Sequence, residues 1–244
     1  MSAQLRSEFV KLRSTRTNLG LLIGMVALVL LVVLVTGFAV PATEAAKAAH
    51  QRALVSLGLQ GGFIAALIGV MSICSEFRHG TIRPTFVFTP NRSRVLVAKL
   101  ISSLALGATF GIIAEALAFP LGLATLAARG IDVVVPTREF VLVAVGSIAV
   151  SALMAALGVG VGALIRNQVF AVIAVISWFM LIEGLITLAW PDVGKYLPLG
   201  ASSPVRGLEG DHLLNPTQGG LLLTAYVAAF FLAGLGATRR RDVI

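Results

Sequence analysis

The chain has 244 residues, of which 57% are hydrophobic and only 12% are charged, and its mean hydropathy is +0.95. Soluble domains carry about 25% charged residues, so this composition excludes an ordinary soluble globular protein. The formal net charge is +8. Nucleic-acid-binding proteins are also basic, so the distribution of this charge along the chain decides whether it indicates such a partner.

The chain begins with a short basic and apolar segment, residues 1–18. Leu5, Phe9 and Leu12 recur at helical spacing, with basic residues elsewhere around the helix, which predicts an N-terminal amphipathic helix at the membrane interface. The apolar run that follows is longer than the 7–15 residues typical of a signal peptide. A retained first span is therefore favoured over a cleaved leader.

Six apolar blocks are each long enough to cross a bilayer, which takes about 20 helical residues. They are also much longer than the roughly 10-residue strands of a membrane barrel. The sequence therefore predicts an all-α, polytopic membrane protein with a six-helix transmembrane domain over residues 19–238. Its spans are 19–40, 53–74, 95–127, 140–165, 169–190 and 219–237.

A polar segment, residues 75–94, interrupts the chain between the second and third spans. Gly80 favours a sharp turn and Thr81 a helix cap, while Thr89-Pro90 ends a short helix over residues 82–88. This helix presents apolar and aromatic side chains. Two interpretations stay open: it rests in the lipid headgroups, or it docks into a groove of another protein.

Two acidic residues, Glu115 and Glu183, fall inside predicted spans. By helical rise, Glu115 lies about 24 Å beyond Lys99 and Glu183 about 10 Å before Trp190, so both belong near the same side of the membrane. Intramembrane carboxylates are functional candidates by default, and these two are candidate residues of a substrate path. The alternative is that each only bonds a neighbouring helix or faces water of an outer loop.

Residues 191–218 form the longest connection, and the stretch "YLPLGASSPVRGL" within it is apolar for a free loop. An ordinary ordered loop is one interpretation of this segment. A basic tail, residues 239–244, follows the last span.

The charge distribution predicts the topology. With six spans both termini share one side, and that side carries thirteen Lys and Arg residues against six on the other. The positive-inside rule then places both termini and the 75–94 segment in the cytoplasm. The basicity is thus explained by topology, and no loop is long enough to form a basic nucleic-acid-binding face.

No catalytic or metal-binding pattern is present in the sequence. The three histidines have no second ligand at a metal-binding spacing, the single Cys74 excludes an internal disulfide, and no G-x-S-x-G occurs. No G-x-x-x-x-G-K-[ST] occurs either, so the chain has no P-loop of its own. We therefore expect no enzyme activity and no metal or other cofactor in this chain.

The stretch "EFRHGTIRPTFVFTPNRSRVLVAK" resembles the signature of membrane subunits of ABC-2-type transporters. The similar features are an acidic residue, Gly-Thr, a short apolar helix, Thr-Pro, a Ser/Arg cluster and a Lys that opens the next span. The six spans, the amphipathic N-terminal helix and the long segment before the last span also fit that family.

The resemblance implies a permease subunit of an ATP-driven exporter, multi-pass in the plasma membrane, with ATP and Mg bound by a separate ATPase subunit. It implies that residues 82–88 form a coupling helix on that ATPase, and that two permease copies or paralogues pair in the bilayer. It also implies that residues 191–218 dip back as a re-entrant gate, which is favoured over an ordinary surface loop; non-helical backbone at that depth needs protein or water around it. A drug, antibiotic or lipid-like amphiphile is the expected class of substrate. The expected partner-binding residues are Glu76, Gly80, Thr81, Ile82, Arg83, Phe86, Phe88 and Pro90. The alternative is a non-transporting membrane scaffold or a sensor or immunity protein.

Overall fold

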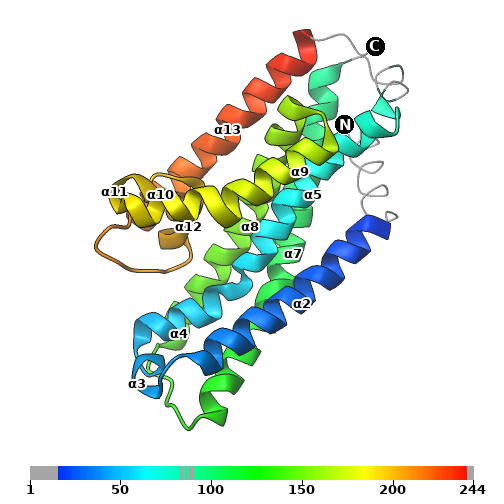
Figure 1. The fold of residues 1–244 in the computed structure, drawn as a ribbon. Helices are drawn as coiled ribbons and strands as arrows, with labels where there is room; N and C mark the ends of the chain where they lie inside the picture. Colours follow the sequence, from blue (N-terminus) through cyan, green and yellow to red (C-terminus); the bar gives the residue numbers. More distant parts are fainter. Residues whose placement is uncertain (1–15, 83–84, 86, 88–90, 241–244) are drawn as a thin grey trace.

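The computed structural model describes residues 16–82, 85, 87 and 91–240, and no β-strand occurs among them. Long helices run side by side along one slanted axis (Figure 1). The fold class is all-α, as predicted. The predicted N-terminal amphipathic helix and the end of the basic tail fall at residues 1–15 and 241–244, outside the described residues.

Six helical stretches are long and apolar enough to span a membrane, which confirms the six predicted spans. Five of them are dominated by one helix each, and the fifth span in chain order is built from three consecutive pieces. The helices of the spans are α2 (Arg16–Ala39), α5 (Leu59–Arg78), α7 (Arg92–Ala128), α8 (Thr137–Ile165), α9 (Gln168–Ser177), η2 (Trp178–Ile182), α10 (Glu183–Ala189) and α13 (Pro216–Arg240).

The two sides of the bundle differ in their connections. Helices α2 and α13 begin and end, respectively, on one side, which we call the terminal side (Figure 1). The other side, called here the opposite side, carries five short helical elements of the part of the chain that the structure describes. These are α3 (Ala42–Ala45), α4 (Ala48–Val55), the 3₁₀ turn η1 (Ser56–Gly58), α11 (Pro191–Gly194) and α12 (Pro198–Val205).

The core of the bundle is the contact of α5, α7 and α8. Glycines let the backbones approach: a Cβ added at Gly69 on α5 would collide with the Ala155 carbonyl oxygen of α8, and one at Gly158 on α8 with the Ala66 carbonyl oxygen of α5. Gly107 on α7 meets α8 in the same way. Small residues at helix crossings are how spans pack in lipid, where burial of apolar surface gives no driving force.

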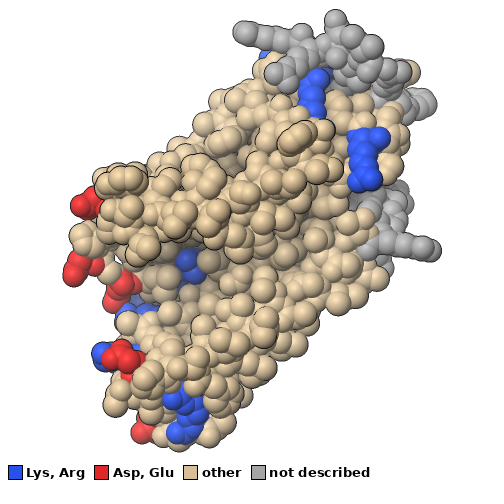
Figure 2. Space-filling view, in the orientation of Figure 1, with Lys and Arg blue, Asp and Glu red and all other residues tan. Residues whose placement is uncertain are grey.

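The outer flanks of the bundle are apolar and exposed. Leu19, Ile23 and Leu31 on α2 and Phe170 on α9 are each more than half exposed, as expected of side chains that face lipid tails. Figure 2 shows acidic side chains only toward the opposite side, whereas the charged side chains visible at the terminal side are Lys and Arg. This asymmetry agrees with the charge count in the sequence.

Candidate functional site

The connection between α5 and α7 lies on the terminal side and turns at Gly80, whose φ of 67° is a left-handed conformation that favours glycine. Ile82, Thr85 and Val87 have helical conformation, and the Thr85 backbone N–H and hydroxyl both bond to the Thr81 carbonyl oxygen, at 3.3 and 2.9 Å. Arg83, Phe86, Phe88 and Pro90 lie outside the described residues.

Two apolar side chains among the described residues of this segment differ in exposure. Ile82 is buried, with 4% of its surface exposed, so it holds the segment against its own chain. Val87, in contrast, is 75% exposed. An exposed apolar side chain on a charged, polar segment is available to a partner or to the lipid surface.

A buried ion pair joins α5 and α7 where this segment leaves them. Lys99 on α7 donates from Nζ to the Glu76 carboxylate of α5 at 2.8 Å and to the Ser72 carbonyl oxygen at 2.9 Å. Both side chains are almost fully buried, at 1% and 8% exposed. Glu76, one of the predicted partner-binding residues, faces Lys99 inside the bundle and joins the end of α5 to the start of α7. Its role in partner binding stays a prediction.

Arginines attach the end of α13 to the same region. Arg92 at the start of α7 donates to the Thr238 carbonyl oxygen at 2.8 Å, and Arg166, after α8, donates to that of Ala237 at 3.0 Å. Cations at the carbonyl oxygens of a helix's last turn are favourable because they complement the helix dipole. The terminal ends of α5, α7, α8 and α13 are therefore tied together around the base of the 79–91 segment.

On the opposite side, Glu183 holds the start of α12. Its Oε1 accepts hydrogen bonds from the backbone N–H groups of Leu199 and Gly200, at 2.5 and 3.2 Å, and its Oε2 accepts from the Trp178 indole at 2.9 Å. A carboxylate at a helix N-terminus satisfies donors that have no partner in the helix. Glu183 is 1% exposed, so α10 and α12 share one buried, saturated carboxylate.

The π-helical turn η2 directly precedes Glu183. A π turn places one additional residue in the helix, which rotates every residue after it relative to a regular α-helix. Met180 and Leu181 in this turn are exposed, whereas Glu183 is buried against α12. The distortion thus allows one span to present apolar residues to lipid and a carboxylate to the protein interior.

Glu115, on α7, faces the other end of α12. Its side chain is 4% exposed and its neighbouring polar groups are the Ser147 hydroxyl and the Arg206 guanidinium. Neither carboxylate oxygen has a donor in hydrogen-bonding geometry among the described residues. The η1 turn passes so close that a Cβ at Gly58 would collide with this carboxylate.

Arg206 directly follows α12 and is 6% exposed. Its guanidinium lies 3.5 Å from both oxygens of Ser56 and 3.3 Å from the Ser203 hydroxyl, and it interacts electrostatically with Glu115. Arg206, which the sequence analysis places among the charges of the loops, is therefore buried.

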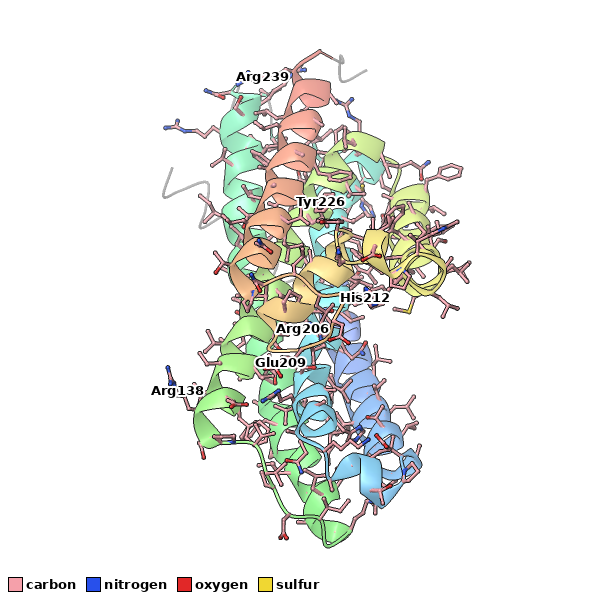
Figure 3. All side chains as sticks on the ribbon, turned by 90° about the vertical axis from the view of Figure 1, so that its left-hand side faces the viewer. Arg138, Arg206, Glu209, His212, Tyr226 and Arg239 are labelled. Carbon is pink, nitrogen blue, oxygen red and sulfur yellow. The ribbon has the colours of Figure 1, made fainter. Side chains whose placement is uncertain are left out.

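The C-terminal end of α12 packs against the middle of α8. The Val205 carbonyl oxygen lies where a Cβ of Gly146 would stand, and Gly146 is nine residues, or about 13 Å, inside the start of α8. Figure 3 shows Arg206 higher in the bundle than Arg138, which marks the first turn of α8. Glu209, three residues later, lies at the surface and pairs with Arg52 at 2.6 Å. Whether the 191–218 segment is a re-entrant gate or a surface loop stays a prediction.

The two acids noted in the sequence therefore act on one element. Glu183 binds the N-terminal end of α12 and Glu115 faces the arginine at its C-terminal end. Their roles in a substrate path remain a prediction. The apolar composition of residues 196–208 was the sequence signal for burial of this segment, and the pairing with Arg206 had no local signal at all.

No group of three or more His, Cys, Asp or Glu residues suited to a metal ion occurs in the part of the chain that the structure describes. No protein-family model matches the sequence, and no curated protein is similar enough to match it.

Proposed function

We propose that this chain is the membrane-spanning permease subunit of an ATP-driven exporter of the ABC-2 type. It works in the plasma membrane with a separate ATPase subunit and a second permease copy or paralogue, and its terminal side faces the cytoplasm. ATP and Mg bind to the partner ATPase, and the substrate is a drug, antibiotic or lipid-like amphiphile.

The observation that carries the proposal is the connection between α5 and α7. It turns at Gly80, exposes Val87, and is joined at its base to both spans by the buried Glu76–Lys99 pair. A loop that only rests on lipid needs no such attachment. A segment that transmits a partner's movement does, because the displacement must reach the spans and not be absorbed in the loop.

The opposite side supplies the element that such a movement would act on. The start of α12 bonds to Glu183 of α10, and the arginine that follows its end faces Glu115 of α7. In the proposed cycle, ATP-driven closure of two ATPases displaces the 79–91 segment together with α5 and α7. The shift of α7 moves Glu115 relative to Arg206 and opens the outer end of the substrate path.

A purification from membranes in mild detergent, with mass spectrometry of the associated proteins, tests the proposal. A P-loop ATPase is expected in near-stoichiometric amount. Val87→Asp should abolish its recovery, because a charge replaces an exposed apolar contact, and Val133→Asp is the matched control. Val133 is 49% exposed in the connection between α7 and α8, on the opposite side of the membrane.

Two results would contradict the proposal. Absence of any ATPase from a folded, monodisperse preparation would favour a non-transporting scaffold or a sensor or immunity protein. Equal recovery of the ATPase with both aspartate variants would assign its docking to a surface other than the 79–91 segment.

A further inference from the structure

The opposite side of the bundle is hollowed. Figure 2 shows this hollow between the region of α10 to α12 and the region of α3 and α4, with Lys or Arg atoms at its floor. Charged side chains at the surface nearby are paired, since Arg52 of α4 donates to Glu139 and Glu209 at 2.9 and 2.6 Å. Glu115 and Arg206, which are 4% and 6% exposed, take no part in these pairs.

The carboxylate of Glu115 lies in a group of unpaired acceptors. Its Oε1 and Oε2, and the Oγ of its neighbour Ser147, have no hydrogen-bond partner among the described residues. Ser147 is fully buried. A buried polar atom without a partner is costly, and most such atoms in proteins are bonded. The η1 turn covers one face of the carboxylate at Gly58, so a partner reaches it from the side of Ser147 and Arg206.

The guanidinium of Arg206 is short of acceptors. Its Nε has no partner among the described residues, and its contacts with Ser56 and Ser203 are long, at 3.5 and 3.3 Å. Charge-assisted hydrogen bonds are usually about 2.7–2.9 Å. Arg206 interacts electrostatically with Glu115, but no hydrogen bond joins the two charges. A carboxylate and a guanidinium therefore lie near each other, and each has unused capacity for hydrogen bonds.

The chemical complement of this cluster has two parts. A primary ammonium group offers three N–H donors, which match the three unpaired acceptor atoms of Glu115 and Ser147. A quaternary ammonium has the same charge but no N–H donor. A phosphate or carboxylate complements Arg206, because the planar guanidinium binds such anions through parallel N–H bonds. A ligand with one charge alone would satisfy one half of the cluster and meet a like charge in the other half.

We propose that Glu115, Ser147 and Arg206 bind a zwitterionic group in which a primary ammonium is linked closely to an anionic phosphate or carboxylate. Such a group is supplied by the headgroup of a membrane lipid or by a small soluble zwitterion. The inference deepens the proposed function by naming the polar part of the substrate. It rests on that function only in calling the bound molecule a substrate, since binding itself requires no ATPase.

Native mass spectrometry of the detergent-purified chain tests the proposal. Phosphatidylethanolamine and phosphatidylcholine with identical acyl chains are compared, because their headgroups carry the same charges and differ in N–H donors. Phosphatidylethanolamine should bind at least about tenfold more tightly. Calorimetry with free phosphoethanolamine then distinguishes the sources. Binding of the free compound shows that a soluble zwitterion suffices, and binding of the lipid alone assigns a lipid headgroup.

Glu115→Gln removes the charge and one of the two carboxylate acceptors, so its binding of phosphatidylethanolamine should fall about tenfold. Glu44→Gln is the matched control and should leave binding unchanged, because Glu44 is 53% exposed on α3 of the same side. Ser147→Ala removes the third acceptor and should weaken binding about fivefold. It provides a second test if Glu115→Gln does not fold.

Three results would overturn the proposal. One is equal binding of the two lipids, and another is unchanged binding in both Glu115→Gln and Ser147→Ala. The third is inorganic phosphate that binds as tightly as phosphoethanolamine, which would assign an anion site on Arg206 alone. Recovery of the ATPase without zwitterion binding would refute this inference and leave the proposed function intact. Zwitterion binding without any ATPase would refute the proposed function and leave the site intact.

Discussion

Lys99 and Glu76 are the clearest case of two residues whose roles depend on each other. Burying either charge alone is costly, and the pair is tolerable only because the Lys99 ammonium also bonds the Ser72 carbonyl oxygen. Each residue seen alone suggests a different role, Glu76 as a surface acid before a loop and Lys99 as a cation that opens a span. Together they set the distance between α5 and α7 at the terminal side.

We predict that Lys99→Met destabilises the protein by about 3–5 kcal/mol, the usual cost of breaking a buried pair. The double variant Glu76→Gln/Lys99→Met should recover most of that loss, because no charge is then left buried. Thermal unfolding of the detergent-solubilised protein measures both. The exposed Lys47–Glu44 pair, with side chains 61% and 53% exposed, is the control, and Lys47→Met should change stability by about 0–1 kcal/mol. Equal effects at the two lysines would contradict the assignment.

Glu183 gives a second prediction at this scale. Glu183→Leu leaves the backbone N–H groups of Leu199 and Gly200 and the Trp178 indole without an acceptor, at about 1–3 kcal/mol for each buried donor. Amide hydrogen exchange in α12 should become much faster, while exchange in α5 is unchanged. Glu183→Gln keeps an acceptor oxygen and should show a smaller effect. Unchanged exchange in α12 for Glu183→Leu would show that this helix is held by other contacts.

The contact of helix α5 with helix α8 depends on glycines, which have no side chain. Gly69 and Gly158 bring each helix against a carbonyl oxygen of the other, so the bundle core is built from backbone surfaces. The same principle places α12, since its last residue rests on Gly146. Apolar side chains are then left to face lipid, where burial would gain nothing.

Gly158→Ala is predicted to destabilise the fold by about 1–3 kcal/mol, because its new methyl group meets the Ala66 carbonyl oxygen and the helices must separate. Gly24→Ala on α2 is the matched control, since a Cβ there meets nothing within 4 Å. That variant should be neutral or gain up to about 1 kcal/mol from helix propensity. Thermal unfolding in detergent compares the two, and a ranking in the reverse order would refute the packing of α5 on α8.

The elements were largely predictable from the sequence because lipid imposes a strict requirement on span length and composition. All six spans and the turn at Gly80 follow from local residue patterns. The partners of Glu115 and Glu183 do not, since Arg206 and the start of α12 reach them only through tertiary folding. The π turn η2 also has no local sequence pattern, because it depends on whether the residues after it contact lipid or the protein interior.

For the whole molecule, the charge asymmetry predicts which side of the membrane each connection faces. In a Cys74→Ser background, Val133→Cys should react with a membrane-impermeant maleimide in intact cells. Val87→Cys should react only after the membrane is permeabilised. Both valines are exposed, at 49% and 75%, so accessibility to solvent does not separate them. The reverse pattern would show that the topology is inverted. Labelling of both cysteines in intact cells would contradict the predicted topology.

Helix α7 has a mechanical consequence. It runs unbroken over 37 residues, and Lys99 and Glu115 are about 24 Å apart along it, with Pro120 lying beyond both. This stretch is therefore a continuous helix with no proline between the two residues. Coupling free energies are reciprocal. To the extent that a partner bound at residues 79–91 changes the affinity of a molecule that wedges α12 away from Glu115, that molecule changes the affinity of the partner by the same factor.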